Sequence, residues 1–232
     1  MLNSTITVKI KERLNKLDSN DYDNIECWQI VEAFNKAQVE WARRQLHGIN
    51  LTKEGDEGST RRKDDLHILL LTYQLNIANK EYYYEGGLPQ DYLQWKRVDV
   101  FAKKDCCDKR RMTVYFAEEG NLNQLLRDKA KQPNFDWAET FATLKGGDVN
   151  IYTNNEFDIE RADLIYYRQP IKIEIANCVD PYTGITSPVN VPCEFKDDII
   201  ELIIDEAASI IAGDIESGNQ FSRGTETAER NN

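Results

Sequence analysis

The sequence predicts an α+β fold, in which a helical bundle formed by the N-terminal helices and the C-terminal helix has a mainly antiparallel β domain inserted between them. Three observations predict it: apolar residues recur at helical spacing near both ends of the chain, the apolar period changes to two in the middle, and a Gly-Gly pair marks a hairpin. The expected parts are a helical part (residues 1–87), a β domain with hairpins and one short helix (88–192), a C-terminal helix packing with the helical part (193–216), and an extended C-terminal arm (217–232).

The N-terminal helices are predicted from their apolar faces. A short helix is expected over about residues 5–17, and a second begins after Asp23, an N-cap with Glu26 in capping-box register. Its apolar stripe consists of Cys27, Ile30, Val31, Phe34, Ala37, Gln38 and Trp41. A third helix is expected from about residue 61, antiparallel to the second. The residues on its apolar face would be Leu66, Leu69, Leu70, Tyr73 and Ile77.

The β domain is predicted from residue 88 onward, because Val98, Val100 and Ala102 alternate with more polar residues. Gly146-Gly147 supplies the positive φ that a tight hairpin turn requires. A short helix is expected near residues 122–129, and the Pro/Gly-rich stretch 181–192 is expected to be a loop. The further strands are expected at about residues 112–117, 137–144, 149–153, 157–167 and 171–177.

The last predicted helix, at about residues 194–216, is unusually apolar. Its polar strip is narrow and consists of Asp198, Glu201 and Asp205. A surface helix needs an apolar stripe of roughly 100°, and this one is wider, so we expect it to be covered on more than one side, by its own domain or by a neighbouring subunit. The segment 217–232 after it is polar, with Phe221 as its large apolar residue.

Composition excludes several function classes. With 29 Lys and Arg against 40 Asp and Glu, the net charge of −11 disfavours a protein whose main task is to hold nucleic acid or an anionic membrane. The sequence shows neither a signal-peptide pattern nor an apolar stretch of membrane-spanning length, which favours a cytoplasmic origin. The five cysteines lack CxxC spacing and are expected to be reduced thiols.

The sequence offers no catalytic, cofactor-binding or metal-binding candidates. His47 and His67 lack a partner motif, and the vicinal pair Cys106-Cys107 is best interpreted as part of a solvated loop. Phosphate-binding, dinucleotide-binding, zinc-protease and serine-hydrolase motifs are missing from the sequence. We therefore expect a protein that is not an enzyme and uses no cofactor.

One basic cluster stands out in the acidic chain, and its loop spans residues 103–111. A contact with the DNA backbone and a contact with an acidic protein both fit it, because charge patches chiefly steer and orient partners. The choice between them stays open. The cluster consists of Lys96, Arg97, Lys103, Lys104, Lys109, Arg110 and Arg111.

Four short motifs, taken in order, give the chain a family resemblance. They are Phe34-Asn35-Lys36-Ala37-Gln38 with Trp41, then Arg62-Lys63-Asp64-Asp65-Leu66, then Leu88-Pro89-Gln90-Asp91-Tyr92-Leu93, then Tyr167-Arg168-Gln169-Pro170. This succession, over about residues 8–217, resembles the head-to-tail connector ring proteins of crAss-like phages. A looser likeness extends to the tail-tubular gatekeeper adaptors of short-tailed phages.

The resemblance implies a structural virion protein that forms a homododecameric ring. The ring would join the portal of the head to the tail and continue the DNA channel, so that DNA passes through the lumen without specific binding. The implied partners are ring neighbours, the portal protein and another tail or ring protein, but no membrane, and the implied location is the head–tail junction of a virion assembled in the bacterial cytoplasm. The residues expected at these interfaces are Ile199, Ile203, Ile210, Ile211, Phe221, Arg110 and Arg111.

Two alternatives remain open at this stage. One is a tail or neck ring farther from the portal. The other is a module that binds a receptor or a glycan through exposed aromatic residues, because aromatic side chains favour recognition. Its surface would be formed by Tyr82, Tyr83, Tyr84, Tyr152, Tyr166 and Tyr167. The C-terminal arm, including Phe221, is expected to dock on the portal or on an adjacent ring.

Overall fold

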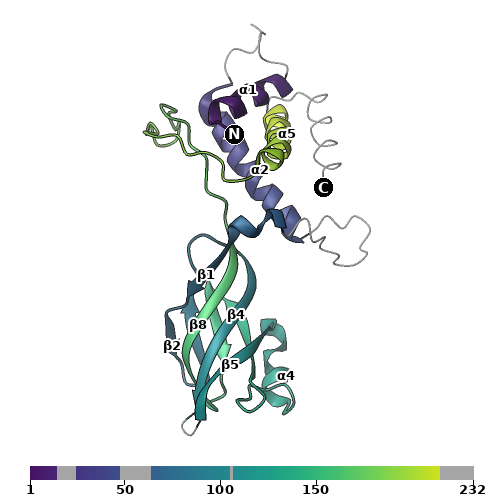
Figure 1. Cartoon of the computed structure of the whole chain (residues 1–232), viewed down its shortest axis with the longest axis vertical. Helices are drawn as coiled ribbons and strands as arrows, with labels where there is room; N and C mark the ends of the chain where they lie inside the picture. The colour runs from purple at the N-terminus through teal and green to yellow at the C-terminus, as the bar shows by residue number, and fades with distance from the viewer. Residues whose placement is uncertain (15–24, 48–63, 105–106, 215–232) are drawn as a thin grey trace, which may run out of the picture. The chain divides into compact units, whose positions relative to one another are not determined.

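The computed structural model describes residues 1–14, 25–47, 64–104 and 107–214. The chain divides into two compact units, Met1–Ile68 with Pro170–Asn232, and Leu69–Gln169. The first unit is helical, and the second holds an eight-stranded, mostly antiparallel curled sheet (Figure 1). The predicted α+β class is therefore confirmed, with helices from both ends of the chain and the sheet between them in sequence.

The helical unit is built from α1 (Asn3–Arg13), α2 (Cys27–His47) and α5 (Asp197–Asp214), and both α1 and α2 pack against α5. The α2 stripe is buried as predicted, with Ile30, Phe34 and Ala37 fully enclosed. Helix α5 is covered on more than one side, again as predicted, and its cover comes from its own chain. The apolar residues that α5 buries are Ile199, Ile200, Ile203, Ile204, Ala207, Ala208, Ile211 and Ala212.

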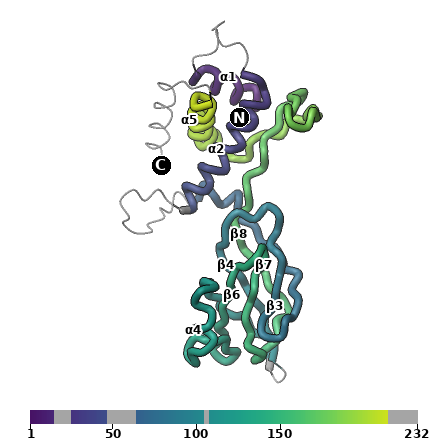
Figure 2. The backbone as a smooth tube through the Cα atoms, turned by 180° about the vertical axis from the view of Figure 1, so that it is seen from behind, coloured from purple at the N-terminus to yellow at the C-terminus, as the bar shows by residue number. Residues whose placement is uncertain are grey.

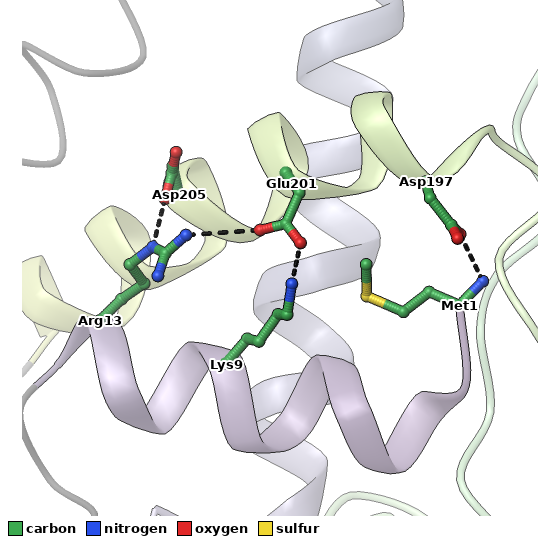
Figure 3. A network of polar contacts seen from close by, with 6 residues as sticks. All are labelled: Met1, Lys9, Arg13, Asp197, Glu201 and Asp205. Carbon is green, nitrogen blue, oxygen red and sulfur yellow. Dashed lines mark hydrogen bonds and ion pairs between the residues drawn. The ribbon is translucent and has the colours of Figure 1, made fainter.

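The polar strip of α5 faces the basic side of α1 (Figure 3). The amino group of Met1 lies 2.6 Å from Asp197 Oδ1, Lys9 pairs with Glu201, and Arg13 Nε donates to Asp205 Oδ1 at 2.7 Å. The hydrogen bond to Asp205 raises the pKa of Arg13. Exposed pairs of this kind each contribute at most about 1 kcal/mol, so they set the register of two parallel helices whose stability comes from apolar burial.

The sheet unit begins earlier than the sequence suggested. The helix expected from residue 61 is wrong from Leu70 onward, because the short helix η2 (His67–Leu69) leads into strands β1 (Leu70–Gln74) and β2 (Ile77–Asn79). Residues 61–63 lie outside the described part. The run of apolar residues after Leu66 fits either helix or strand spacing, and short runs cannot be distinguished by period alone. β1 forms a strand because it pairs antiparallel with a later strand, β8 (Asp158–Arg168).

The remaining strands are β3 (Tyr83–Gly87), β4 (Tyr92–Lys104), β5 (Cys107–Phe116), β6 (Glu139–Lys145) and β7 (Asp148–Tyr152). The order across the sheet is β1-β8-β4-β5-β6-β7-β3-β2, and β5 with β6 is its parallel pair. The short helices η3 (Glu119–Asn121) and α4 (Leu122–Arg127) lie in the crossover between them, as Figure 2 shows from behind. The predicted hairpin joins β6 to β7, with φ of 62° at Gly146 and 96° at Gly147.

One side of the curled sheet encloses the core of this unit. The predicted alternation in β4 is confirmed, because Val98, Val100 and Ala102 are buried while Arg97 is exposed and Asp99 and Phe101 are only partly covered. The three buried residues of β4 pack in one cluster with Leu164 of β8 and Ile151 of β7. Strands from different parts of the sheet therefore share a single core. A second, smaller cluster contains Phe141 and Tyr152 and is covered by leucines of α4.

Gly86 of β3 lies close against Leu75, which connects β1 to β2. A Cβ placed on Gly86 would lie 3.0 Å from Leu75 Cβ, whereas a Cβ on the adjacent Gly87 would meet nothing nearer than Asp148 Oδ1 at 3.7 Å. We expect Gly86→Ala to lower the free energy of unfolding by about 1–3 kcal/mol, the usual cost of overpacking. Urea denaturation measures this, with Gly87→Ala as the control. Equal effects of the two substitutions would contradict the proposed steric cause.

Tyr166 should make the sheet unit lose stability at alkaline pH. Burial, together with the hydrogen bond that its hydroxyl donates to Asp91 Oδ1 at 2.8 Å, raises the pKa of Tyr166 to about 12. A tyrosine in an unfolded chain loses its proton near pH 10, so this stabilisation is present below about pH 10 and is lost as the pH rises toward 12. In Tyr166→Phe the fall in unfolding free energy between pH 10 and 12 should be smaller. Urea unfolding followed by circular dichroism at each pH measures it, and an unchanged fall would refute the assignment.

Candidate interaction surface

Of the histidines and vicinal cysteines considered as chemical candidates, His67 is the one whose side chain the structure describes. The described residues contain no group of three or more His, Cys, Asp or Glu side chains placed to hold a metal ion. His67 is exposed, with its ring nitrogen Nδ1 against the backbone oxygen of Asp64. The side chains of His47, Cys106 and Cys107 lie outside the described part. Within that part, too, no helix is both long enough and apolar enough to cross a membrane.

The basic cluster is largely paired within its own unit. Arg111 Nη2 lies 2.8 Å from Asp99 Oδ1, and Arg97 Nε lies 3.4 Å from the same oxygen. Lys104 and Lys109 pair with Glu156 and Glu160. Arg110 points elsewhere: its Nη1 donates to the carbonyl oxygens of Phe135 and Asp136 at 3.1 and 2.8 Å, and its guanidinium lies over the Phe135 ring. Arg110 and Arg111 are therefore engaged in separate contacts, and the structure does not bring them together as one site.

The predicted interface on the last helix is mostly inaccessible. Ile199, Ile203 and Ile211 are buried by the other helices of the unit, and Ile210 is only partly exposed. Phe221 lies outside the described residues. Four of the six tyrosines proposed as a recognition surface are also buried, namely Tyr84, Tyr152, Tyr166 and Tyr167, and of the six only Tyr82 is exposed. Among the described residues, more exposed apolar surface is found elsewhere in the helical unit.

The long loop, residues 170–192, provides such a surface within the helical unit. The strand expected at residues 171–177 is wrong: the loop contains only isolated bridges, Glu174 with Val191 and Val179 with Thr186. Figures 1 and 2 show it as a long irregular loop next to α2. Because it joins no sheet, its backbone groups need other hydrogen-bond partners.

Amide side chains from two helices supply those partners. Asn35 on α2 accepts from the Ile173 N–H at 2.8 Å and donates to the Ile173 carbonyl at 3.2 Å, as a neighbouring strand would. Gln38, fully buried on the same helix, donates to the carbonyl of Ile171 at 3.0 Å. Asn3 on α1 donates to the carbonyls of Glu174 and Val191, at 2.7 and 2.9 Å. Both legs of the long loop are thereby fixed to the helices.

A disulfide fixes the middle of the long loop. Cys27, the first residue of α2, is bonded to Cys178, and the two Cα atoms are 5.8 Å apart. The expectation of five reduced thiols is therefore wrong for this pair. Their separation of 151 residues follows no spacing motif, so only the fold reveals their proximity. Cys193 is a buried free cysteine, and burial raises the pKa of its thiol.

The tip of the long loop is a structured turn. Asp180 Oδ1 accepts the Tyr182 N–H at 2.8 Å and Oδ2 accepts the Thr183 hydroxyl at 2.9 Å, and these bonds lower the pKa of Asp180. Gly184 closes the turn with a φ of 68° and an N–H bond of 2.8 Å to the Asp180 carbonyl. A side-chain carboxylate bonding two residues onward is a common way to stabilise such a turn.

The long loop is therefore held firmly while it presents apolar side chains to solvent. Tyr182 is 80% exposed and Ile185 is 68% exposed, and Ile171, Val179 and Val189 are each about half exposed. Several exposed apolar side chains on one loop favour an interaction site. Sequence reasoning missed this surface. The available signals were Gln38 in an apolar stripe and the Ile, Val and Tyr residues scattered through a Pro/Gly-rich stretch.

The Cys27–Cys178 disulfide can be tested directly. Digestion without reductant should release the Cys27 and Cys178 peptides joined together, and mass spectrometry should find them separate after reduction. Reduction or Cys27→Ser should also destabilise the helical unit by a few kcal/mol, about the value expected for closing a loop of this length. Faster amide hydrogen exchange at Ser187, whose N–H bonds to the Cys178 carbonyl, would report the loosened loop. Unlinked peptides from the untreated protein would contradict the bond.

Comparison with known proteins gives no relative from which a role could be transferred. No family model matches the chain, and no curated protein matches it at a significant level. The candidate surface therefore rests on its own residues: a loop with fixed legs, a disulfide at Cys178 and exposed apolar side chains at its tip.

Proposed function

We propose that this chain is a structural virion protein, a subunit of a homododecameric ring that connects the portal of a phage head to the tail and continues the DNA channel. The observation that carries the proposal is the long loop, whose exposed Tyr182 and Ile185 are held in place before any partner arrives. A preorganised loop loses little conformational freedom on binding, so its apolar area contributes more fully to affinity. The four ordered motifs, which resemble those of connector ring proteins, favour this particular class of assembly.

A closed ring requires each subunit to present two different, complementary faces. The long loop would supply one of them. The sheet unit offers separate exposed aromatic residues, since Tyr115, Phe116 and Trp137 are all more than half exposed. These residues lie around the β5 to β6 crossover, where a hollow of about 500 Å³ is lined by Phe116, Leu125 and Phe141. Each unit thus carries apolar surface suited to a heterologous contact.

The disulfide fits a virion component. Bonds of this kind are rare in the reducing cytosol and persist on particles released into oxidising surroundings. A ring assembled in the host cytoplasm would acquire the Cys27–Cys178 bond when the virion leaves the cell. The bond would then fix the long loop in a particle that must survive outside the host.

Native mass spectrometry and electron microscopy of the purified protein, alone and with portal protein, test the proposal. We expect closed rings in one or both samples. The double variant Tyr182→Ser/Ile185→Ser should weaken subunit association about 100-fold, because removing two large apolar contacts costs about 3 kcal/mol. Val8→Ser, a substitution of a half-exposed apolar residue on α1, is the matched control and should assemble normally.

Two outcomes would refute the proposal or the role that it gives to the long loop. A protein that stays monomeric both alone and with portal protein is not a connector ring. A ring that forms equally well with the double variant does not use the long loop. Rings that form without any affinity for portal protein would favour a tail or neck ring farther from the portal.

A further inference from the structure

A groove lies between the first turns of α2 and the long loop, inside the helical unit. Its volume is about 680 Å³, which falls in the range of sites that enclose a ligand or a peptide side chain. Trp28 and Val31 of α2 line one side, and Ile173, Ile185 and Pro188 of the long loop line the other. Its walls are therefore apolar and come from two segments far apart in the sequence.

The walls of the groove are held in place by their own contacts. The disulfide between Cys27 and Cys178 joins the two walls, and Asn35 fixes the backbone of Ile173. The ring of Trp28 meets the ring of Tyr182 edge to face at 6.2 Å. A site held in this way needs no rearrangement to accept a side chain.

The charged residues around the groove favour a cationic occupant. Glu32, Glu174 and Asp180 contribute three carboxylates, and Lys172 contributes one ammonium. The Glu174 carboxylate accepts the Ser187 hydroxyl at 2.6 Å, and the Asp180 carboxylate stabilises the turn, so both are held in place. An apolar groove with this rim suits a segment that combines one large apolar side chain with one positive charge.

We propose that the occupant is residues 217–224 of the C-terminal arm, with Phe221 seated between α2 and the long loop and Arg223 against the carboxylates. The segment reads Ser-Gly-Asn-Gln-Phe-Ser-Arg-Gly, so it carries one cation and no acid in a chain whose net charge is −11. Phe221 is the sole aromatic residue after Asp214. Residues two apart project to the same side of an extended chain, which would let Phe221 and Arg223 reach one surface together. The inference does not depend on the proposed ring.

Photo-crosslinking of the full-length chain tests the inference. Phe221 is replaced by p-benzoylphenylalanine, the protein is irradiated, and the crosslinked peptides are mapped by mass spectrometry. We expect crosslinks to peptides that contain Trp28 and Val31 or Ile173 and Ile185. Mixing isotopically light and heavy chains then shows whether the occupant comes from the same copy or from a second copy, and either result supports the groove.

A charge-reversal pair provides the control. Glu32→Lys on the rim of the groove should lower the crosslink yield on the order of fivefold, as expected for removing one favourable charge contact. Glu40→Lys makes the same change at an exposed position two turns along α2 and should leave the yield unchanged. Crosslinks that map outside the groove, or only to portal protein when it is added, would overturn the inference. Native mass on the same samples reports ring formation separately, so a failure here is distinguishable from a failure of the proposed function.

Discussion

Burial of α5 is the constraint on which the helical unit depends. This helix carries isoleucine on so much of its circumference that one neighbouring helix could not cover it, and α1 and α2 close over it from different sides. Residues separated by nearly the whole chain therefore have to meet before either end is stable. The ion pairs of Lys9 and Arg13 then select the alignment of α1 along α5. Apolar burial drives the association, and charge decides the register.

The long loop that leads into α5 also needs hydrogen-bond partners for its backbone. The long loop approaches this core without entering a sheet, so its carbonyl and N–H groups would be costly to leave unpaired. Asn3, Asn35 and Gln38 resolve this from helix positions where apolar residues would otherwise be expected. The polar residues at the base of the loop and the exposed apolar residues at its tip thus serve opposite needs. The base holds the loop in place, and the tip is left for a partner.

Sequence reasoning recovered what local pattern determines. The stripe of α2, the alternation in β4 and the turn at Gly146-Gly147 each follow from spacing within a few residues. It failed where distant segments decide. Leu70 and Tyr73 suit a helix face until β8 provides a strand partner, and residues 171–177 suit a strand until Asn35 takes the hydrogen bonds of Ile173. The same holds for the candidate site, because neither the Cys27–Cys178 pair nor the groove leaves a trace in local spacing.

The outer strands of the sheet limit how this protein can meet other chains. β1 and β2 form the two margins of the sheet, yet they are consecutive in the chain, five and three residues long, with only Leu75 and Asn76 between them. Short margins offer few free backbone groups to an incoming strand. Aggregation by strand addition at the sheet edges is thereby disfavoured, even at the high local concentration that many copies in one particle would create. Contacts between copies of this chain would then be made through side chains rather than through paired strands.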